Sequence, residues 1–249
     1  MRKLIEIENS SESSSALCTI VEVKGSAPRK VGAKMLVLEN GEIYGTIGGG
    51  NLEKKIIENA IKQIKKKEAT LFTHDLLGQH NMCCGGVVKI FIEPIMKIKK
   101  IYIFGAGHTG KALSNLMEKL DFEVYIIDDR KEYIDKITNK KINKLNLSYK
   151  DILPTLPFDK NTYITIMTYE HSHDRDILSY CIKKEFAYLG MIGSKRKVSL
   201  TKKMFLDGGI CNKKEINKID MPMGIDINAE GPEEIAVSIA SKIIAIKNK

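Results

Sequence analysis

Several features that define other classes of protein are scarce in this sequence. It has no tryptophan, only 6% aromatic residues and six prolines among 249 residues. No apolar run approaches the roughly 18 to 20 residues that a membrane-spanning helix needs, and the amino-terminal segment lacks the apolar stretch of a secretory signal. The five cysteines, an odd number that includes the neighbours Cys83 and Cys84, do not suit a disulfide framework. We therefore expect a soluble, cytoplasmic protein with no membrane association.

The charge balance is basic, but it does not identify a partner. Lysine and arginine number 40 against 31 acidic residues, which gives a formal net charge of +9. A basic protein can bind nucleic acid. Here, however, the lysines are spread along the whole chain, and the few aromatic side chains offer little surface on which bases could stack. Solvated, lysine-rich faces are the simpler interpretation, so we expect no nucleic-acid partner.

The first part of the chain, residues 1–97, has the pattern of a small α+β domain. The expected strands are residues 18–23, 33–38, 42–47 and 87–94. An apolar stripe at helical spacing starts after Asn51, which is placed to cap a helix. A loop containing His74 is expected to follow that helix. The pattern predicts an antiparallel sheet with one helix.

From residue 98 the pattern changes to strands that alternate with helices, which is typical of a parallel sheet. The expected strands are residues 101–104, 124–129, 162–168 and 187–193. Pro232 suits the first turn of a closing helix that extends to Ile246. The predicted fold class is therefore α/β, with a Rossmann-like domain over 98–249 preceded by the smaller α+β domain over 1–97.

A glycine motif lies between the first expected strand and helix of the second domain. Gly105, Gly107 and Gly110 fit the pattern G-x-G-x-x-G, in which glycines permit a tight turn and a close approach to a pyrophosphate. Asp128 ends the next strand, where a carboxylate can accept hydrogen bonds from ribose hydroxyls. These residues predict a dinucleotide-binding fold, although such a fold can exist without its ligand.

A second glycine run, Gly48-Gly49-Gly50, precedes the helix of the first domain. Successive glycines let backbone N–H groups converge on an anion, and the helix dipole adds positive potential. Glu53, in the first turn of that helix, is either a ligand contact or a residue favoured by the dipole. Ser26 and Arg29 either add hydroxyl and guanidinium contacts to a phosphate-like group or simply belong to a turn.

Three residues are candidates for catalysis. Cys84, beside flexible glycine backbone, is a reactive thiol, a ligand for a soft metal or a buried side chain. His171 and Asp174 follow the strand at 162–168, and open α/β sheets bind ligands beyond the carboxyl ends of their strands. The alternative is that Asp174 is a polar residue at a helix start. No set of ligands completes a closed zinc site, so we predict no metal centre.

Six motifs, in order along the chain, resemble one protein family. They are GSAPRKVGAKMLV, GTIGGGNLE, CGG before a strand ending in EP, FGAGHTG, MIGSKRK and PMGIDINAEGPEEIAVSI. Together they resemble the xanthine dehydrogenase accessory protein family, XdhC/CoxI. The sequence departs from that family at Tyr169-Glu170, where Arg-Gly often stands.

The resemblance implies a role in the maturation of a molybdenum hydroxylase. It implies binding of the molybdenum cofactor, support of its sulfuration by a cysteine desulfurase, and delivery to a xanthine-dehydrogenase-type apoenzyme. Such a protein is closer to a cofactor-binding chaperone than to a turnover enzyme, and a homodimer is expected. Two alternatives stay open: an NAD(P)-dependent oxidoreductase of a small substrate, and a protein-binding scaffold whose Rossmann fold is empty.

Overall fold

The computed structural model describes residues 2–11, 13–79 and 85–248. The chain divides into two compact units, Met1–Lys97 and Ile98–Lys249, and each has its own sheet and its own core. Within the described ranges, none of the helices combines the length and the apolar character that crossing a bilayer requires.

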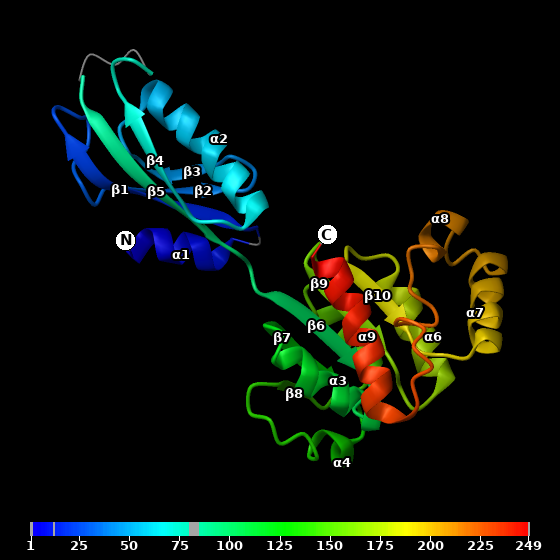
Figure 1. The fold of residues 1–249 in the computed structure, drawn as a ribbon. Helices are drawn as coiled ribbons and strands as arrows, with labels where there is room; N and C mark the ends of the chain where they lie inside the picture. Colours follow the sequence, from blue (N-terminus) through cyan, green and yellow to red (C-terminus); the bar gives the residue numbers. More distant parts are fainter. Residues whose placement is uncertain (1, 12, 80–84, 249) are drawn as a thin grey trace. The chain divides into compact units, whose positions relative to one another are not determined.

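The first unit is an antiparallel sheet with a long helix, α2, along one face (Figure 1). Its elements are α1 (Arg2–Ser10), β1 (Ser15–Lys24), β2 (Lys34–Leu38), β3 (Ile43–Gly45), α2 (Gly50–Lys66), β4 (Thr70–Asp75) and β5 (Val87–Ile95). The strand order is β3-β2-β1-β5-β4. Alternate strand residues such as Ile20 and Ile90 pack against the apolar stripe of α2, which includes Leu52 and Ile56.

Two predictions for this unit are wrong. The helix begins at Gly50 with Gly49 as its N-cap, one residue before the position expected from Asn51. The φ angles of +80° at Gly49 and +61° at Gly50 let the chain turn into the helix there, a route closed to most other residues. His74 lies in β4 rather than in a loop, because alternation along this strand turns it to the buried face while Thr73 is exposed.

The second unit is a parallel sheet covered by helices, which confirms the predicted fold class. Its strands are β6 (Lys99–Phe104), β7 (Phe122–Ile127), β8 (Asn143–Leu145), β9 (Thr162–Ile166) and β10 (Tyr188–Met191). Its helices are α3 (His108–Glu118), α4 (Lys131–Ile134), α5 (Tyr149–Ile152), the 3-10 turn η1 (Leu153–Thr155), α6 (His171–Cys181), α7 (Lys195–Asp207), α8 (Lys213–Ile216) and α9 (Gly231–Lys247). The strand order is β10-β9-β6-β7-β8.

The central strand β6 separates two cores. Ile101 and Ile103 pack with residues of α3 and α9, which lie side by side in Figure 1, whereas Tyr102 and Phe104 belong to the core that includes α6. The chain order reverses between β6 and β9. In such sheets the carboxyl ends of the strands at the reversal form the edge where ligands bind. That edge carries the glycine motif of residues 105–110.

Candidate functional site

The glycine run of the first unit does converge on an anion, and the anion is the side chain of Glu53. Its Oε1 atom accepts hydrogen bonds from the backbone N–H groups of Ile47, Gly48 and Gly49 at 3.0, 3.2 and 2.9 Å. The hydroxyl of Thr46 donates to the same oxygen. A concave array of backbone donors of this kind is a binding site for one oxyanion.

The hydrogen bonds keep Glu53 in its charged form. Burial alone would raise the pKa of this carboxyl, but the bonds from Thr46 and the three N–H groups outweigh burial and lower the pKa. Of the two roles that the sequence left open, neither describes Glu53 fully. It is a carboxylate built into the chain that fills the array from the helix side.

Two other motifs meet this glycine run. A Cβ atom at Gly48 would lie 3.2 Å from the ring of Pro28, so the turn containing Pro28 packs directly on the run. Ser26 forms an isolated β-bridge with Gly85, and a Cβ atom at Gly86 would lie 2.3 Å from the carbonyl oxygen of Ser26. The fold thus gathers three segments that are far apart in sequence.

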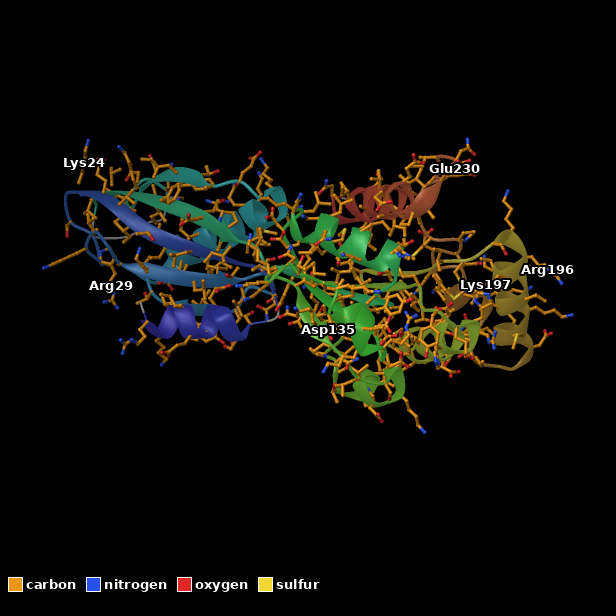
Figure 2. All side chains as sticks on the ribbon, turned by 90° about the horizontal axis from the view of Figure 1, so that it is seen from below. Lys24, Arg29, Asp135, Arg196, Lys197 and Glu230 are labelled. Carbon is orange, nitrogen blue, oxygen red and sulfur yellow. The ribbon has the colours of Figure 1, made fainter. Side chains whose placement is uncertain are left out.

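The side chains expected to assist anion binding lie at the surface. Ser26 and Arg29 are both exposed, and Figure 2 shows Arg29 and Lys24 at the same end of the first unit. Within the described residues no hydrogen bond or ion pair holds the Arg29 side chain. The guanidinium is therefore available to a ligand.

The cysteines of the described ranges are unsuited to thiolate chemistry. Cys18, Cys181 and Cys211 are buried, and burial raises the pKa of Cys18 and of Cys181 to about 12. Cys84, the thiol that the sequence favours, lies outside the described residues, and so does Cys83. Among the described side chains, no group of three His, Cys, Asp or Glu residues is arranged to hold a metal ion.

The three fingerprint glycines of the second unit have different reasons to be glycine. A Cβ atom at Gly105 would lie 2.3 Å from the carbonyl oxygen of Met167, and one at Gly110 would lie 1.9 Å from that of Gly105. Both are therefore required by packing. Gly107, the N-cap of α3, has a φ of −63°, and no heavy atom of the described residues lies within 4 Å of a Cβ atom placed there.

The amino terminus of α3 remains available to an anion. Within the described part of the chain, no side chain caps this helix. The first N–H groups of an α-helix have no partner within the helix and carry the positive end of its dipole. The space beside Gly107 is thus where a pyrophosphate would approach.

Asp128 is engaged within the chain rather than presented to a ribose. Its side chain is fully buried, and Oδ2 accepts a hydrogen bond from the N–H group of Ala106 at 2.7 Å. The guanidinium of Arg130 donates to both oxygens, at 2.9 and 2.8 Å. Burial would raise the pKa of Asp128, but the bonds from Arg130 and Ala106 lower it. The carboxylate therefore fixes the glycine loop to Arg130.

Arg130 is the group that reaches the surface beside this loop. Its guanidinium lies 3.9 Å from the ring centre of Tyr133 and 4.1 Å from that of Tyr169. Rings on either side and a carboxylate partner hold its planar group in place. Sequence reasoning missed Arg130, although an arginine two residues after the fingerprint acid was a visible signal.

His171 and Asp174 lie at the same sheet edge but in different environments. Asp174 is fully buried and accepts hydrogen bonds from the N–H group and hydroxyl of Thr168, at 2.9 and 2.7 Å. Lys197, at the start of α7, donates to its other oxygen at 2.7 Å and is only 13% exposed. Figure 2 shows Lys197 on the inner side of α7 and Arg196 on its outer side.

This ion pair ties the loops after β9 and β10 together. The imidazole of His171 is 69% exposed, and its Nδ1 atom lies 3.7 Å from Asp174. Asp174 is therefore bound within the chain, and His171 is the member of the candidate pair that a ligand can reach. Sequence reasoning missed Lys197, which follows the strand next to β9 in the sheet.

Comparisons with known proteins agree with this fold. Residues 101–243 match the XdhC Rossmann domain, and residues 10–75 match the XdhC and CoxI family. The chain is 30% identical over 240 residues to the uncharacterized protein YqeB of Escherichia coli strain K12; the match covers 94% of this chain and 43% of YqeB. The chain thus spans less than half the length of that relative.

Two further relatives are named for xanthine dehydrogenase. A probable xanthine dehydrogenase subunit from Bacillus subtilis strain 168 is 22% identical over 315 residues, which cover 94% of this chain and 93% of that protein. A crystal structure of a xanthine dehydrogenase from Bacillus halodurans shares the fold, with a TM-score of 0.54 and 22% identity over 99% of this chain and 95% of that one. The match to the Rossmann domain spans more than half of the chain, so this protein belongs to the XdhC and CoxI family.

Proposed function

We propose that this protein is an accessory factor in the maturation of a xanthine-dehydrogenase-type molybdenum hydroxylase. In this role it binds the molybdenum cofactor, supports its sulfuration and delivers it to the apoenzyme. Family membership and the names of the two Bacillus relatives support the general role. Cofactor binding is supported mainly by one observation, the array of backbone donors that holds the Glu53 carboxylate.

The residues of this array fit the phosphate group that the cofactor carries. A phosphate oxygen requires the same donors as a carboxylate oxygen, so the N–H groups of Ile47, Gly48 and Gly49 would hold it once Glu53 moves away. Arg29, exposed at the adjoining turn, would add a cation. When bound, the cofactor supplies the molybdenum and dithiolene on which the hydroxylase depends. The part of this chain is to hold an anion and to release it.

Glu53 acts in this proposal as a competitor that belongs to the protein. Its carboxylate satisfies N–H groups that would otherwise be desolvated without an acceptor, which is costly. A phosphate with a larger charge displaces it, and the carboxylate returns when the ligand leaves. Such competition lowers the net affinity, as a protein that must deliver its ligand requires.

The proposal includes a cysteine desulfurase as sulfur donor, a hydroxylase apoenzyme as acceptor, and a cytoplasmic homodimer as the working form. The family resemblance supports these partners. Because the described cysteines are buried, a thiol that takes part in sulfuration would be Cys84.

The geometry gives less support to an NAD(P)-dependent oxidoreductase. In that alternative the Asp128 carboxylate bonds to ribose hydroxyls, but both of its oxygens accept hydrogen bonds from Ala106 or Arg130. The amino terminus of α3 remains compatible with a bound phosphate.

Native mass spectrometry of the full chain, made in cells with an intact cofactor pathway, tests the proposal. We expect a bound mass equal to that of a molybdenum cofactor, and a larger bound fraction in Glu53→Gln, whose neutral amide competes less well. Glu58→Gln is the matched control, because Glu58 lies on the same helix and is exposed. A chain that carries no such mass and does not activate apoenzyme would contradict the proposal and favour a protein-binding scaffold.

A further inference from the structure

The second unit contains a cavity that the proposed function does not use. Its volume is about 860 Å³, and it lies between α6 on one side and α5 with η1 on the other. Asp129 and Tyr149 line one part of it, and side chains along α6, including His173 and Tyr180, form a wall. The glycines of the motif at 105–110 are not among its described lining residues.

Two buried polar atoms in this wall have no hydrogen-bond partner within the described part of the chain. They are the hydroxyl oxygen of Tyr149 and the Oδ1 atom of Asp129. Tyr149 is only 5% exposed, so solvent at the surface does not satisfy its hydroxyl. Proteins rarely bury polar groups without partners, and an exception often marks the place of a bound group.

The surroundings of these two atoms define what each can offer. Oδ2 of Asp129 already accepts a hydrogen bond from the hydroxyl of Tyr169 at 3.1 Å, and that hydroxyl also lies 3.1 Å from Nε2 of His173. Burial, followed by the charges of Asp128 and Asp129, raises the pKa of Tyr149, so its hydroxyl stays protonated and can donate. The wall thus presents an acceptor at Asp129 and a donor at Tyr149. A heterocycle with adjacent donor and acceptor atoms on one edge, such as a nucleobase, matches this pair.

The far end of the cavity is basic. With eleven residues, α6 is about 16 Å long. His173 lies near its amino end, while Lys183 and Lys184, which also line the cavity, follow its carboxyl end. The Nζ atom of Lys184 lies 4.6 Å from the ring centre of Tyr180, and that of Lys183 lies 3.6 Å from Glu215.

The charges in the wall orient a ligand that carries both a ring and an anion. Lys150, Lys183 and Lys184 outnumber the two carboxylates of the lining, Asp129 and Asp176. Asp129 repels an anionic group at its own end, so that group is favoured beside the lysines. The rings of His173 and Tyr180 lie between the two ends and offer aromatic faces to a base.

We propose that this cavity binds a nucleoside phosphate. Asp129 and Tyr149 hold the edge of the base, and Lys183 and Lys184 hold the phosphate. The site is separate from the glycine loop at Gly107, and it does not depend on the molybdenum role.

Calorimetric titration of the full chain tests this site, with AMP as the probe and adenosine and inorganic phosphate as its two halves. We expect saturable binding of AMP and weaker binding of either half. In Tyr149→Phe the affinity for AMP should fall about fivefold, the usual effect of one lost hydrogen bond. The thermal midpoint of this variant should not fall, because the hydroxyl has no partner to lose. Lys184→Gln should weaken AMP but not adenosine, whereas the control Lys203→Gln, which removes an exposed charge on α7, should change neither.

Three results would overturn the proposal. The first is the absence of saturable binding for AMP, CMP, GMP and UMP at millimolar concentration. The second is binding that Gly107→Ala abolishes and Tyr149→Phe leaves intact, which would place the nucleotide on the glycine loop. The third is a lower thermal midpoint of Tyr149→Phe with unchanged affinity, which would make the hydroxyl purely structural.

Discussion

The two glycine loops of this chain look alike in sequence and differ in what occupies them. In the first unit, the N–H groups of Ile47, Gly48 and Gly49 all donate to Glu53. In the second unit, the carboxylate of Asp128 takes one N–H group, that of Ala106, and pairs with an arginine. One loop is therefore filled by its own carboxylate, while the other is held in shape by one.

This difference separates a site that exchanges an internal anion from a site that is left open. An incoming phosphate must displace Glu53 from the first loop. At the second loop, the amino terminus of α3 has no side-chain cap within the described residues, so a phosphate can approach without displacing a protein group. Glycine content alone does not distinguish the two, because the decisive carboxylate differs in position relative to the donors.

The largest expected effect tests the role of packing in the open loop. Gly110→Ala places a Cβ atom 1.9 Å from the carbonyl oxygen of Gly105, and the backbone must shift to accommodate it. We expect the free energy of unfolding to fall by about 3 kcal/mol or more, the upper part of the range for overpacking. Urea denaturation followed by circular dichroism measures it.

Gly107→Ala is the matched control in the same motif. Its Cβ atom meets no described heavy atom within 4 Å, and its φ of −63° suits any residue. We expect a loss of less than about 1 kcal/mol, the scale of a helix-cap change. Equal losses in the two variants would show that the two glycines are not distinguished by packing.

The next largest effect tests whether Asp128 clasps the second loop. Asp128→Asn keeps the shape but removes the charge that Arg130 needs, and the amide cannot accept all the bonds that the carboxylate does. We expect a loss of about 2 kcal/mol in the free energy of unfolding, typical of bonds to a charged group. Asp129→Asn, one residue further on, is the control and should cost less. A neutral result for Asp128→Asn would mean that the pair contributes no net stability.

A smaller effect concerns Glu53 and depends on pH. Because the folded pKa of this carboxyl is lowered, its contribution to stability is complete above the unfolded pKa of about 4.3. That contribution is lost as the pH falls through the folded value. At pH 7, Glu53→Gln should therefore be less stable than the wild type by about 1 kcal/mol.

The difference between wild type and Glu53→Gln should shrink as the pH is lowered below about 4. Urea denaturation at a series of pH values gives this difference directly. A difference that stays constant down to the lowest pH at which the protein folds would show that the ionised carboxylate is not what holds the glycine run.

The sequence predicts the architecture well because periodicity and glycine motifs are local signals. Alternating strands and helices after residue 98 predict the parallel sheet, and both glycine runs are found where a loop enters a helix. The partners of individual side chains are harder to predict. Glu53 reaches back to atoms four to seven residues earlier in the chain, and the sequence does not show whether its side chain turns toward them or toward a ligand.

Long-range pairs require the strand order before they can be predicted. Asp174 and Lys197 follow β9 and β10, and they meet because these strands are neighbours in the sheet. The same holds for Tyr149 and His173, whose rings lie 5.3 Å apart although they belong to different helices. Chemistry of this kind becomes visible only when the topology brings the two segments together.

The smallest effect on stability, and the sharpest test of the first loop as a binding site, concerns Arg29. This residue is exposed, and no ion pair within the described ranges holds its side chain, so Arg29→Gln should change the free energy of unfolding by less than about 0.5 kcal/mol. If the guanidinium contacts the ligand phosphate, the same substitution should weaken cofactor binding by about 1 to 3 kcal/mol, the range for a charge-assisted hydrogen bond. Molybdenum retained after dialysis, measured by mass spectrometry, reports the binding, and Lys30→Gln at the next exposed position is the control. An equal loss of molybdenum from both variants would point to a general effect of charge, whereas a loss from Arg29→Gln alone would assign the contact to this side chain.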